Sequence, residues 1–323
     1  MYIYYIYNMK TLILNKSNIV EGSSNTRYKY KFPSTVHFKK GAKIALSKLS
    51  FYYSWPNVTS LNQNNSFSYQ WFDLSGNLTK TYTLTIPDGY YTYSDLNSWL
   101  YEELCNRGHY VTYPTTTTAL LGTSNGKDYS TSTKYVFFEI QENATYYSCQ
   151  LTLYGVPNYA ATGAVYSAYG NVTGYSWRPP TAITGKYQTG KIVIPSGTNF
   201  SKYLGFNSGT LGTGQVTTSA LQEDLLSNFT PELVPVASVL VLNSMCSNKF
   251  SNPSTLVYSF SATVDYGAMI DVEPNNWLWV DIQPGVYNEF TIELRDQDFK
   301  QMYILDSNNI IIMVLDENED STD

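Results

Sequence analysis

The chain has 323 residues and a formal net charge of −6, from 26 acidic and 20 basic side chains. It is long enough for one large β domain or two small ones with a full core, and its acidic balance is not that of a dedicated nucleic-acid-binding protein. Aromatic residues make up 16% of the chain and charged residues 14%, against about a quarter charged in ordinary domains. This composition favours half-buried strand faces and protein–protein interfaces.

The ends and the cysteines of the chain exclude several classes. Cys105, Cys149 and Cys246 are far apart and in no Cys-x-x-Cys pattern, so they indicate neither a disulfide framework nor a zinc site. Residues 1–8 are apolar but lack a basic leader, so we do not expect a signal peptide, and Met9 is an equally good start. No run is long enough to span a membrane.

The first predicted strand carries a basic face. Arg27, Lys29 and Lys31 alternate with aromatic residues, which puts the cations on one side of a strand that we expect Pro33 to end. The segment up to residue 48 holds nine Lys or Arg and a single Glu. We interpret this segment as a solvated face or as the contact for an acidic partner, and the candidate contact residues are Arg27, Lys29, Lys31, Lys39 and Lys40.

The next segments predict a meander and then a helix. Strands are expected at 43–53, 67–72 and 81–86, and their short polar links favour antiparallel pairing in an all-β sandwich or barrel. Beyond them Ser94 is expected to cap a helix that Gly108 ends. The apolar residues on one face of this helix are Leu96, Trp99, Leu100 and Leu104.

Two polar, loop-like stretches follow, at 108–134 and 155–190, and they flank a predicted hairpin of 135–140 with 148–153. A strand at 191–194 and a short helix at 201–204 come next, and then strands at 236–242, 255–260 and 277–280. We therefore expect a single antiparallel jelly-roll sandwich with one or two short helices. Its expected parts are an N-terminal arm at 1–24, the sandwich at 25–107 and 191–315, a loop-rich insertion at 108–190, and an acidic tail at 316–323.

The C-terminal stretch is expected to complete the core. Phe290, Ile292 and Leu294 alternate with polar residues, which predicts a half-buried strand. The run 310–315 is apolar on both faces and is expected at the centre of a sheet, so the fold would not close until the last strand is made.

No catalytic constellation is predicted. Gly122–Gly126 matches a Gly-x-Ser-x-Gly pattern but lies in a polar loop, and neither His37 nor His109 has an acidic neighbour. Gly185–Lys191 resembles a phosphate-binding loop, but Ile192 replaces the Ser or Thr that contacts magnesium.

The remaining polar and aromatic candidates have ordinary explanations. The acidic residues at 296–298 and 316–320 are more typical of a solvated link and tail than of calcium ligands. Trp71, Trp277 and Trp279 favour core or interface packing over a sugar platform. We expect no enzyme activity, no metal and no cofactor.

Five blocks, in this order, resemble the minor capsid (penton) proteins of Polinton-like viruses, adintoviruses and virophages. They are Arg27–Pro33, Ile44–Ser54, Ile86–Asn97, Thr198–Phe206 and Phe290–Phe299. The resemblance implies a single jelly roll with an outward insertion, five copies of which form the plug at each vertex of an icosahedral virion assembled in the host cell. It also implies a double jelly-roll major capsid protein as neighbour. The genome and a host receptor are open candidates for further partners. The alternative is a carbohydrate-binding, lectin-like jelly roll, because this fold and exposed aromatic residues also serve lectins.

Overall fold

The computed structural model describes residues 9–112, 134–156, 177–178, 180–181, 183–217 and 219–317. The chain forms two compact units. Unit 1 combines both chain ends, residues 1–56 and 234–323, and unit 2 is the continuous segment 57–233. Within the described part of the chain, no helix has the length and apolar character needed to cross a membrane.

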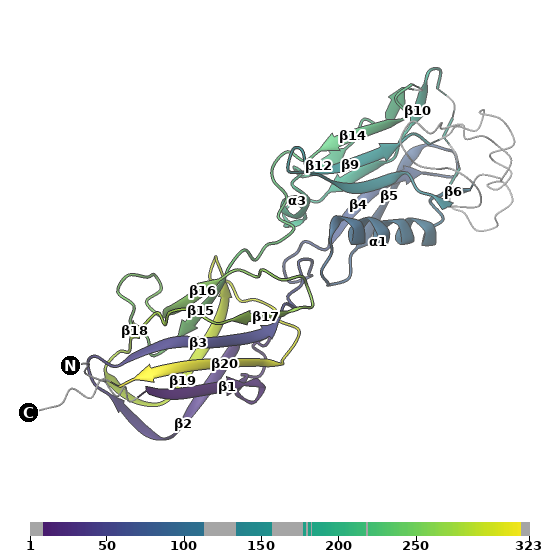
Figure 1. Cartoon of the computed structure of the whole chain (residues 1–323). Helices are drawn as coiled ribbons and strands as arrows, with labels where there is room; N and C mark the ends of the chain where they lie inside the picture. Colours follow the sequence, from purple (N-terminus) through teal and green to yellow (C-terminus); the bar gives the residue numbers. More distant parts are fainter. Residues whose placement is uncertain are drawn as a thin grey trace, which may run out of the picture. The chain divides into compact units, whose positions relative to one another are not determined.

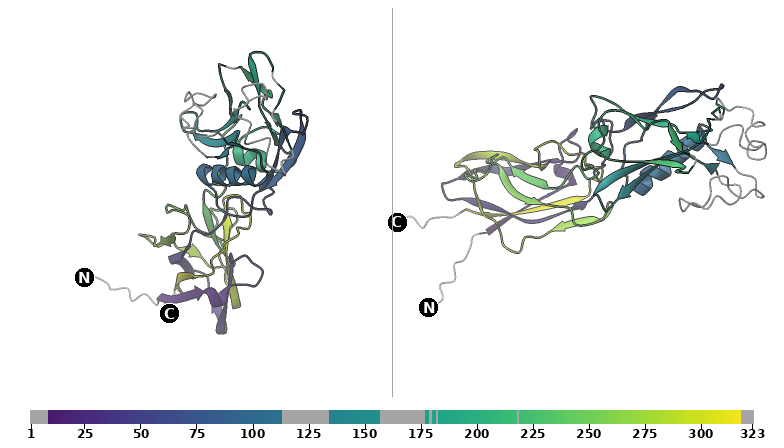
Figure 2. Two further views of the ribbon diagram at one scale, coloured as in Figure 1. Left: turned by 90° about the vertical axis from the view of Figure 1, so that its right-hand side faces the viewer. Right: turned by 90° about the horizontal axis from the view of Figure 1, so that it is seen from above.

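Unit 1 consists of two antiparallel sheets (Figures 1 and 2). Sheet A has the order β1 (Met9–Asn15), β20 (Asn309–Asp316), β3 (Lys43–Tyr52) and β17 (Met269–Val272). The short strand β18 (Val280–Asp281) also pairs with β3. Sheet B has the order β16 (Leu256–Phe260), β15 (Val239–Asn243), β19 (Gly285–Asp296) and β2 (Arg27–Phe38). A single 3-10 turn, η1 (Lys16–Asn18), follows β1.

This pairing is that of a jelly roll. When β17 and β18 are taken as one interrupted strand, the strands of unit 1 in chain order pair as first, eighth, third, sixth in sheet A and as second, seventh, fourth, fifth in sheet B. Such nesting of antiparallel pairs distinguishes a jelly roll from a simple meander. The predicted fold class is therefore confirmed, with the sandwich confined to unit 1.

The last strand occupies the predicted central place. In sheet A, β20 lies between β1 and β3, so the core of unit 1 joins the first and last strands of the chain. Only one face of β20 is fully inside, however: Ile311 and Met313 are buried, whereas Ile310 is 45% exposed. The period of two requires this, because the outer face of sheet A has no layer over Ile310.

Strand β2 runs past the proline that was expected to end it. It continues to Phe38, so the predicted stop at Pro33 is wrong. Its register with β19 shifts between Tyr287 and Glu289, which places Pro33 in an irregular stretch of an edge strand. Proline has no backbone N–H to donate. Its absence costs little stability at Pro33, because the N–H groups on the outer side of an edge strand have no partner strand.

Unit 2 has its own core and most of the short elements. One of its sheets has the order β12 (Gly209–Leu211), β11 (Lys191–Ile194), β4 (Ser66–Phe72) and β5 (Leu78–Thr85). Another has the order β14 (Gln222–Leu226), β9 (Ser148–Tyr154) and β8 (Phe138–Asn143). Its strand pairs are β10 (Lys186–Gln188) with β13 (Gln215–Thr217) and β6 (Val111–Thr112) with β7 (Lys134–Tyr135). The predicted hairpin is confirmed as β8 and β9.

Helix α1 (Tyr93–Asn106) packs against β8 and buries the predicted apolar residues Leu96, Leu100 and Leu104. Its N-cap is Thr92 and not Ser94, because Thr92 and Asp95 form a reciprocal capping box. A second short helix, α3 (Phe200–Leu204), ends at Gly205.

The division into units differs from the one expected from the sequence. Strands β4 and β5 and helix α1 were assigned to the sandwich, but they belong to unit 2, which is inserted whole between β3 and β15. The expected insertion at 108–190 is the middle of that unit. In the expected N-terminal arm, residues 9–15 form β1 of sheet A, because Leu12 and Leu14 face the core.

We expect that unit 1 folds without unit 2. The side-chain amide of Asn57 donates to the carbonyl oxygen of Leu233 over 2.9 Å, so the chain enters and leaves unit 2 at one place. Because such junctions tolerate excision, we expect a chain in which a short Gly-Ser linker replaces residues 57–233 to fold. Circular dichroism should show β structure that melts in one cooperative transition. A non-cooperative melt would show that unit 1 depends on unit 2.

Candidate basic contact surface

The basic face predicted on β2 is present, and the core sets its orientation. Tyr28 is 1% exposed and Phe32 is buried, so the intervening cations face solvent. The ring of Phe290 on β19 lies 5.3 Å from that of Tyr30 and 5.6 Å from that of Phe32, which fixes β2 against sheet B. Arg27, Lys29 and Lys31 are therefore on the outer face of sheet B.

Two of these cations are paired within the chain. Arg27 Nε lies 3.1 Å from Glu293 Oε1, and Lys29 Nζ lies 2.9 Å from Glu289 Oε1. Glu293 also accepts from Arg295 NH2 over 2.8 Å, so the charges form a ladder across the sheet. Exposed pairs of this kind contribute about 0 to 1 kcal/mol each. They neutralise the β19 side of the predicted face.

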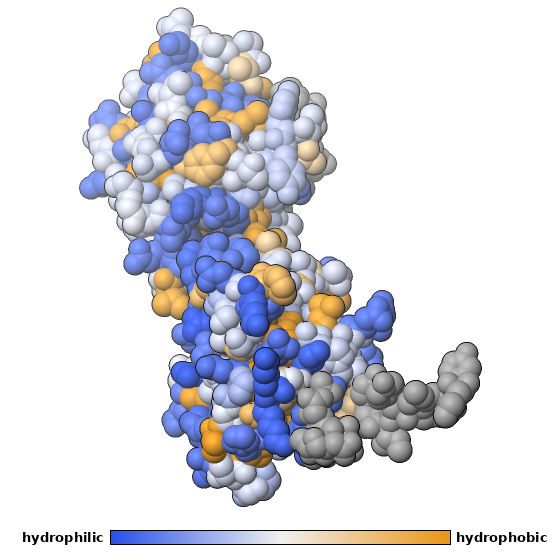
Figure 3. Space-filling model, turned by 90° about the vertical axis from the view of Figure 1, so that its left-hand side faces the viewer, coloured by the Kyte–Doolittle hydropathy of each residue, from blue (hydrophilic) through white to orange (hydrophobic). Residues whose placement is uncertain are grey.

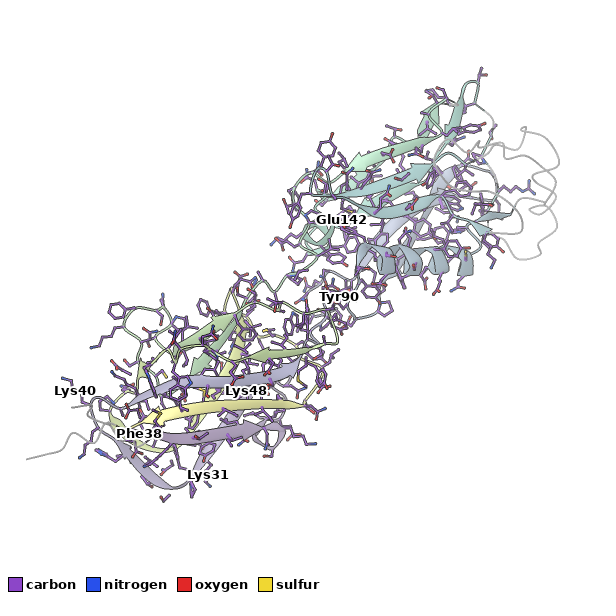
Figure 4. All side chains as sticks on the ribbon, in the orientation of Figure 1. Lys31, Phe38, Lys40, Lys48, Tyr90 and Glu142 are labelled. Carbon is purple, nitrogen blue, oxygen red and sulfur yellow. The ribbon has the colours of Figure 1, made fainter. Side chains whose placement is uncertain are left out.

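The other three predicted residues carry positive charge that no described acidic residue pairs with. Lys31, Lys39 and Lys40 form no ion pair with any described residue. Lys39 and Lys40 follow the end of β2 at Phe38 and lie in the turn before β3, whereas Lys31 lies on β2 itself; Figure 4 labels Lys31 and Lys40. The five predicted residues thus form two groups. One is neutralised, and the other, which we call the free lysines (Lys31, Lys39, Lys40), is open to a partner.

A small polar pocket, missed from the sequence, lies beside Arg27. It has a volume of about 190 Å³ and is lined by Val20, Glu21, Gly22, Ser23, Thr26, Arg27, Glu293, Arg295 and Gln301. Its charges balance, and the hydroxyls of Ser23 and Thr26 already donate to backbone carbonyls. No aromatic residue lines it, although binding pockets for organic ligands are usually lined by apolar and aromatic side chains.

The histidine in unit 2 has a structural environment. His109 is 1% exposed, and its Nδ1 lies 2.7 Å from the Tyr69 hydroxyl. Its ring stacks on Trp71. Burial lowers the pKa of His109 to about 3, with a smaller contribution from Arg107. The side chain is therefore neutral at physiological pH and belongs to the aromatic core.

The remaining sequence motifs are not assembled into sites in the part of the chain described. Lys186–Gln188 and Lys191–Ile194 are strands, so no helix follows the loop-like glycines as a phosphate-binding loop requires. Gly122–Gly126 lies outside the described residues. Asp296 accepts from the backbone N–H groups of Asp298 and Lys300 and so shapes a turn. The described residues hold no group of His, Cys, Asp or Glu arranged to bind a metal.

Comparisons with known proteins give structural likenesses only. No protein-family model matches the chain, and no curated protein matches it. The fold is similar to the crystal structure of the mavirus penton protein, with a TM-score of 0.41 and 12% identity, over 96% of this chain and 98% of that chain. It is also similar to a chain of the Sputnik virophage structure from cryo-EM, with a TM-score of 0.36 and 11% identity, over 98% of this chain and 99% of that chain. The first of these two structures is of a penton protein, the class that the five sequence blocks resemble.

Proposed function

We propose that this chain is a structural protein of an icosahedral virus capsid and that five copies form the vertex, or penton. The observation that carries the proposal is the nesting of a complete second unit inside a single jelly roll whose first and last strands pair. This is the architecture that the five sequence blocks imply. Those blocks lie in both units: three fall on β2, β3 and β19 of unit 1, one on the start of α1 and one on the whole of α3 in unit 2.

Unit 1 has the properties expected of a domain that contacts neighbouring subunits and does not catalyse a reaction. A sandwich can pack laterally while an inserted unit is presented elsewhere, and such a role needs complementary surfaces and no reacting groups. The carbohydrate-binding alternative is less well supported, because the pocket beside Arg27 is small and has no aromatic lining. The localisation that follows is the capsid of a virion, with a major capsid protein around each vertex.

The mass of the purified protein and its place in particles test the proposal. Five copies of the 36.5 kDa chain give a particle of about 180 kDa in mass photometry. In assembled shells, labelled protein should be found at the five-fold vertices. Its absence from the vertices of otherwise complete shells would contradict the proposed function.

We further propose that the free lysines contact an acidic neighbour, either the surrounding capsid protein or the genome. Changing Lys31, Lys39 and Lys40 together to Gln should reduce incorporation into shells at low salt. The wild-type advantage should shrink as salt rises, because exposed charges are screened over roughly 8 Å at physiological ionic strength. Incorporation is measured by competition between tagged wild-type and variant chains.

The matched control is Arg27→Gln with Lys29→Gln, which removes cations from the same strand that are already paired with Glu293 and Glu289. We expect this pair of changes to have a smaller effect on incorporation. Equal incorporation of the triple variant and wild type at low salt would show that the free lysines only solubilise the surface.

A further inference from the structure

Sheet A ends on one side in an edge strand with an apolar outer face. Ile13 of β1 is 54% exposed and pairs directly with the half-buried Ile312 of β20, beside Ile310 at 45% exposure. Among the described residues no strand pairs with the outer edge of β1, so its backbone groups remain open to another chain. We call this surface (Ile13, Ile310, Ile312 and the open side of β1) the isoleucine edge.

The opposite end of sheet A carries a second apolar surface. Val272 of β17 pairs with Leu49, and Val280 of β18 pairs with Ile44, so residues 273–279 loop out opposite only residues 45–48 of β3. This loop presents Trp277 at 39% and Leu278 at 56% exposure. We call this surface (Trp277, Leu278) the tryptophan edge.

The loop of the tryptophan edge is held by its own contacts. The rings of Trp277 and Trp279 meet edge to face with centroids 5.8 Å apart. Asp281 and Gln283, which follow, are hydrogen-bonded to the 244–255 segment through Ser247 and Met245. Large aromatic side chains already fixed in this way lose little conformational entropy on binding, which makes them effective anchors.

The two edges differ in charge as well as in shape. Residues 9–18, on the isoleucine edge, contain Lys10 and Lys16 and no acidic residue. Residues 265–281, on the tryptophan edge, contain Asp265, Asp271, Glu273 and Asp281 and no Lys or Arg. Some of these charges are paired within the chain: Lys10 with Glu317, and Asp271 and Glu273 with Lys48. Lys16 on the isoleucine edge and Asp265 and Asp281 on the tryptophan edge form no ion pair with a described residue, and these three charges favour contact between unlike edges over contact between like edges.

We propose that neighbouring copies of this chain join edge to edge, with the isoleucine edge of one copy against the tryptophan edge of the next. Within one chain the two edges are three strand spacings apart, about 14 Å, and cannot cover each other. A second copy can cover both, because it offers the complementary edge on each side. Repeated contact between unlike surfaces closes into a ring when the rotation from one copy to the next divides a full turn. The inference rests on the proposed oligomer and identifies the surfaces that would build it.

The outer face of sheet B suits this role less well. It carries the ladder of Arg27, Glu293 and Arg295, whose charges are satisfied within the chain. In the face of the molecule that Figure 3 shows, hydrophobic residues occur in small groups separated by hydrophilic ones. Single exposed apolar residues are normal on protein surfaces, whereas apolar residues grouped at an open sheet edge are candidates for a contact surface.

Two single variants test the contact. Ile13→Asp damages only the isoleucine edge and brings an acid toward the acidic edge of its neighbour. Leu278→Lys damages only the tryptophan edge and brings a cation toward Lys16, which forms no ion pair with a described residue. Each should weaken association at least about 30-fold and leave monomers in native mass spectrometry at micromolar protein. Val286→Asp is the matched control, because Val286 is 65% exposed but lies on sheet B.

Mixing the two variants gives the sharper result. The Leu278→Lys chain keeps an intact isoleucine edge and the Ile13→Asp chain keeps an intact tryptophan edge, so one contact forms and neither remaining edge extends it. The mixture should yield dimers with one chain of each kind, although each variant alone is monomeric. Circular dichroism and an unchanged unfolding curve show that the variants are folded.

The outcomes separate this inference from the proposed function. If both variants form the same rings as the wild type, the edge-to-edge contact is overturned. The same follows if the mixture gives no mixed dimer. Either result leaves the vertex proposal intact. A wild-type chain that stays monomeric and is missing from vertices would overturn the vertex proposal and the contact with it. Monomeric variants that form mixed dimers support the contact.

Discussion

Replacing Ile311 by Asp should prevent unit 1 from folding while unit 2 remains folded. Ile311 is 0% exposed on the inner face of β20, and its partners Leu14 on β1 and Leu49 on β3 are equally buried. A carboxylate there has no described partner, and burying it costs at least about 4 kcal/mol. A typical domain has a stability of only about 5 to 15 kcal/mol. Limited proteolysis should leave a fragment close to residues 57–233 and digest the remainder.

Ile310→Asp is the matched control for this experiment. Ile310 is the preceding residue on the same strand, but it faces outward and is 45% exposed. The same substitution there should change the free energy of unfolding by about 1 kcal/mol or less. If Ile311→Asp gave a soluble protein that melts as cooperatively as wild type, the placement of β20 in the core would be wrong.

Replacing Gly205 by Ala should destabilise unit 2 strongly. Gly205 follows α3 with φ of +77°, a left-handed conformation that costs a residue with a Cβ about 1 to 2 kcal/mol. A Cβ there would also overlap the carbonyl oxygen of Phe229. That backbone cannot shift freely, because the N–H groups of Asn228 and Phe229 both donate to the Gly205 carbonyl. Overpacking adds roughly 1 to 3 kcal/mol. Chemical denaturation should therefore show a total loss of about 2 to 5 kcal/mol.

Gly197→Ala separates the two contributions. Gly197 has φ of +74°, but a Cβ there would meet nothing within 4 Å. Its substitution should cost only the conformational part, about 1 to 2 kcal/mol. Equal losses for Gly197→Ala and Gly205→Ala would mean that the segment at 228–229 does not pack against the end of α3 as described.

The two pairs of variants also bear on how the units function. Unit 1 holds the edges and the free lysines, and unit 2 has a separate hydrophobic core built around β4, β8, β9 and α1. A variant that unfolds one unit and spares the other would show that the core of the spared unit is sufficient for that unit. Contacts between copies can then be studied in unit 1 alone.

Much of the local structure followed from the sequence. A period of two placed Tyr28 and Phe32 inside and Lys29 and Lys31 outside, and a period of 3.6 placed Leu96 and Leu100 on the inner face of α1. These predictions succeeded because each depends on neighbours within a few residues along the chain. The continuous apolar run at 310–315 likewise indicated a central strand.

The partition into units and the state of the basic face were decided by tertiary structure. Strands β2 and β4 have the same alternating pattern, yet one pairs with β19 in unit 1 and the other with β5 and β11 in unit 2. Likewise, the pairing of Lys29 with Glu289 joins residues 260 positions apart and neutralises a cation that looks free in the sequence. A local pattern specifies which face of a strand is buried, but it does not specify the partner. The partner depends on register between segments that are distant in the chain, as when β20 pairs with both β1 and β3, and only the assembled sheets specify that register.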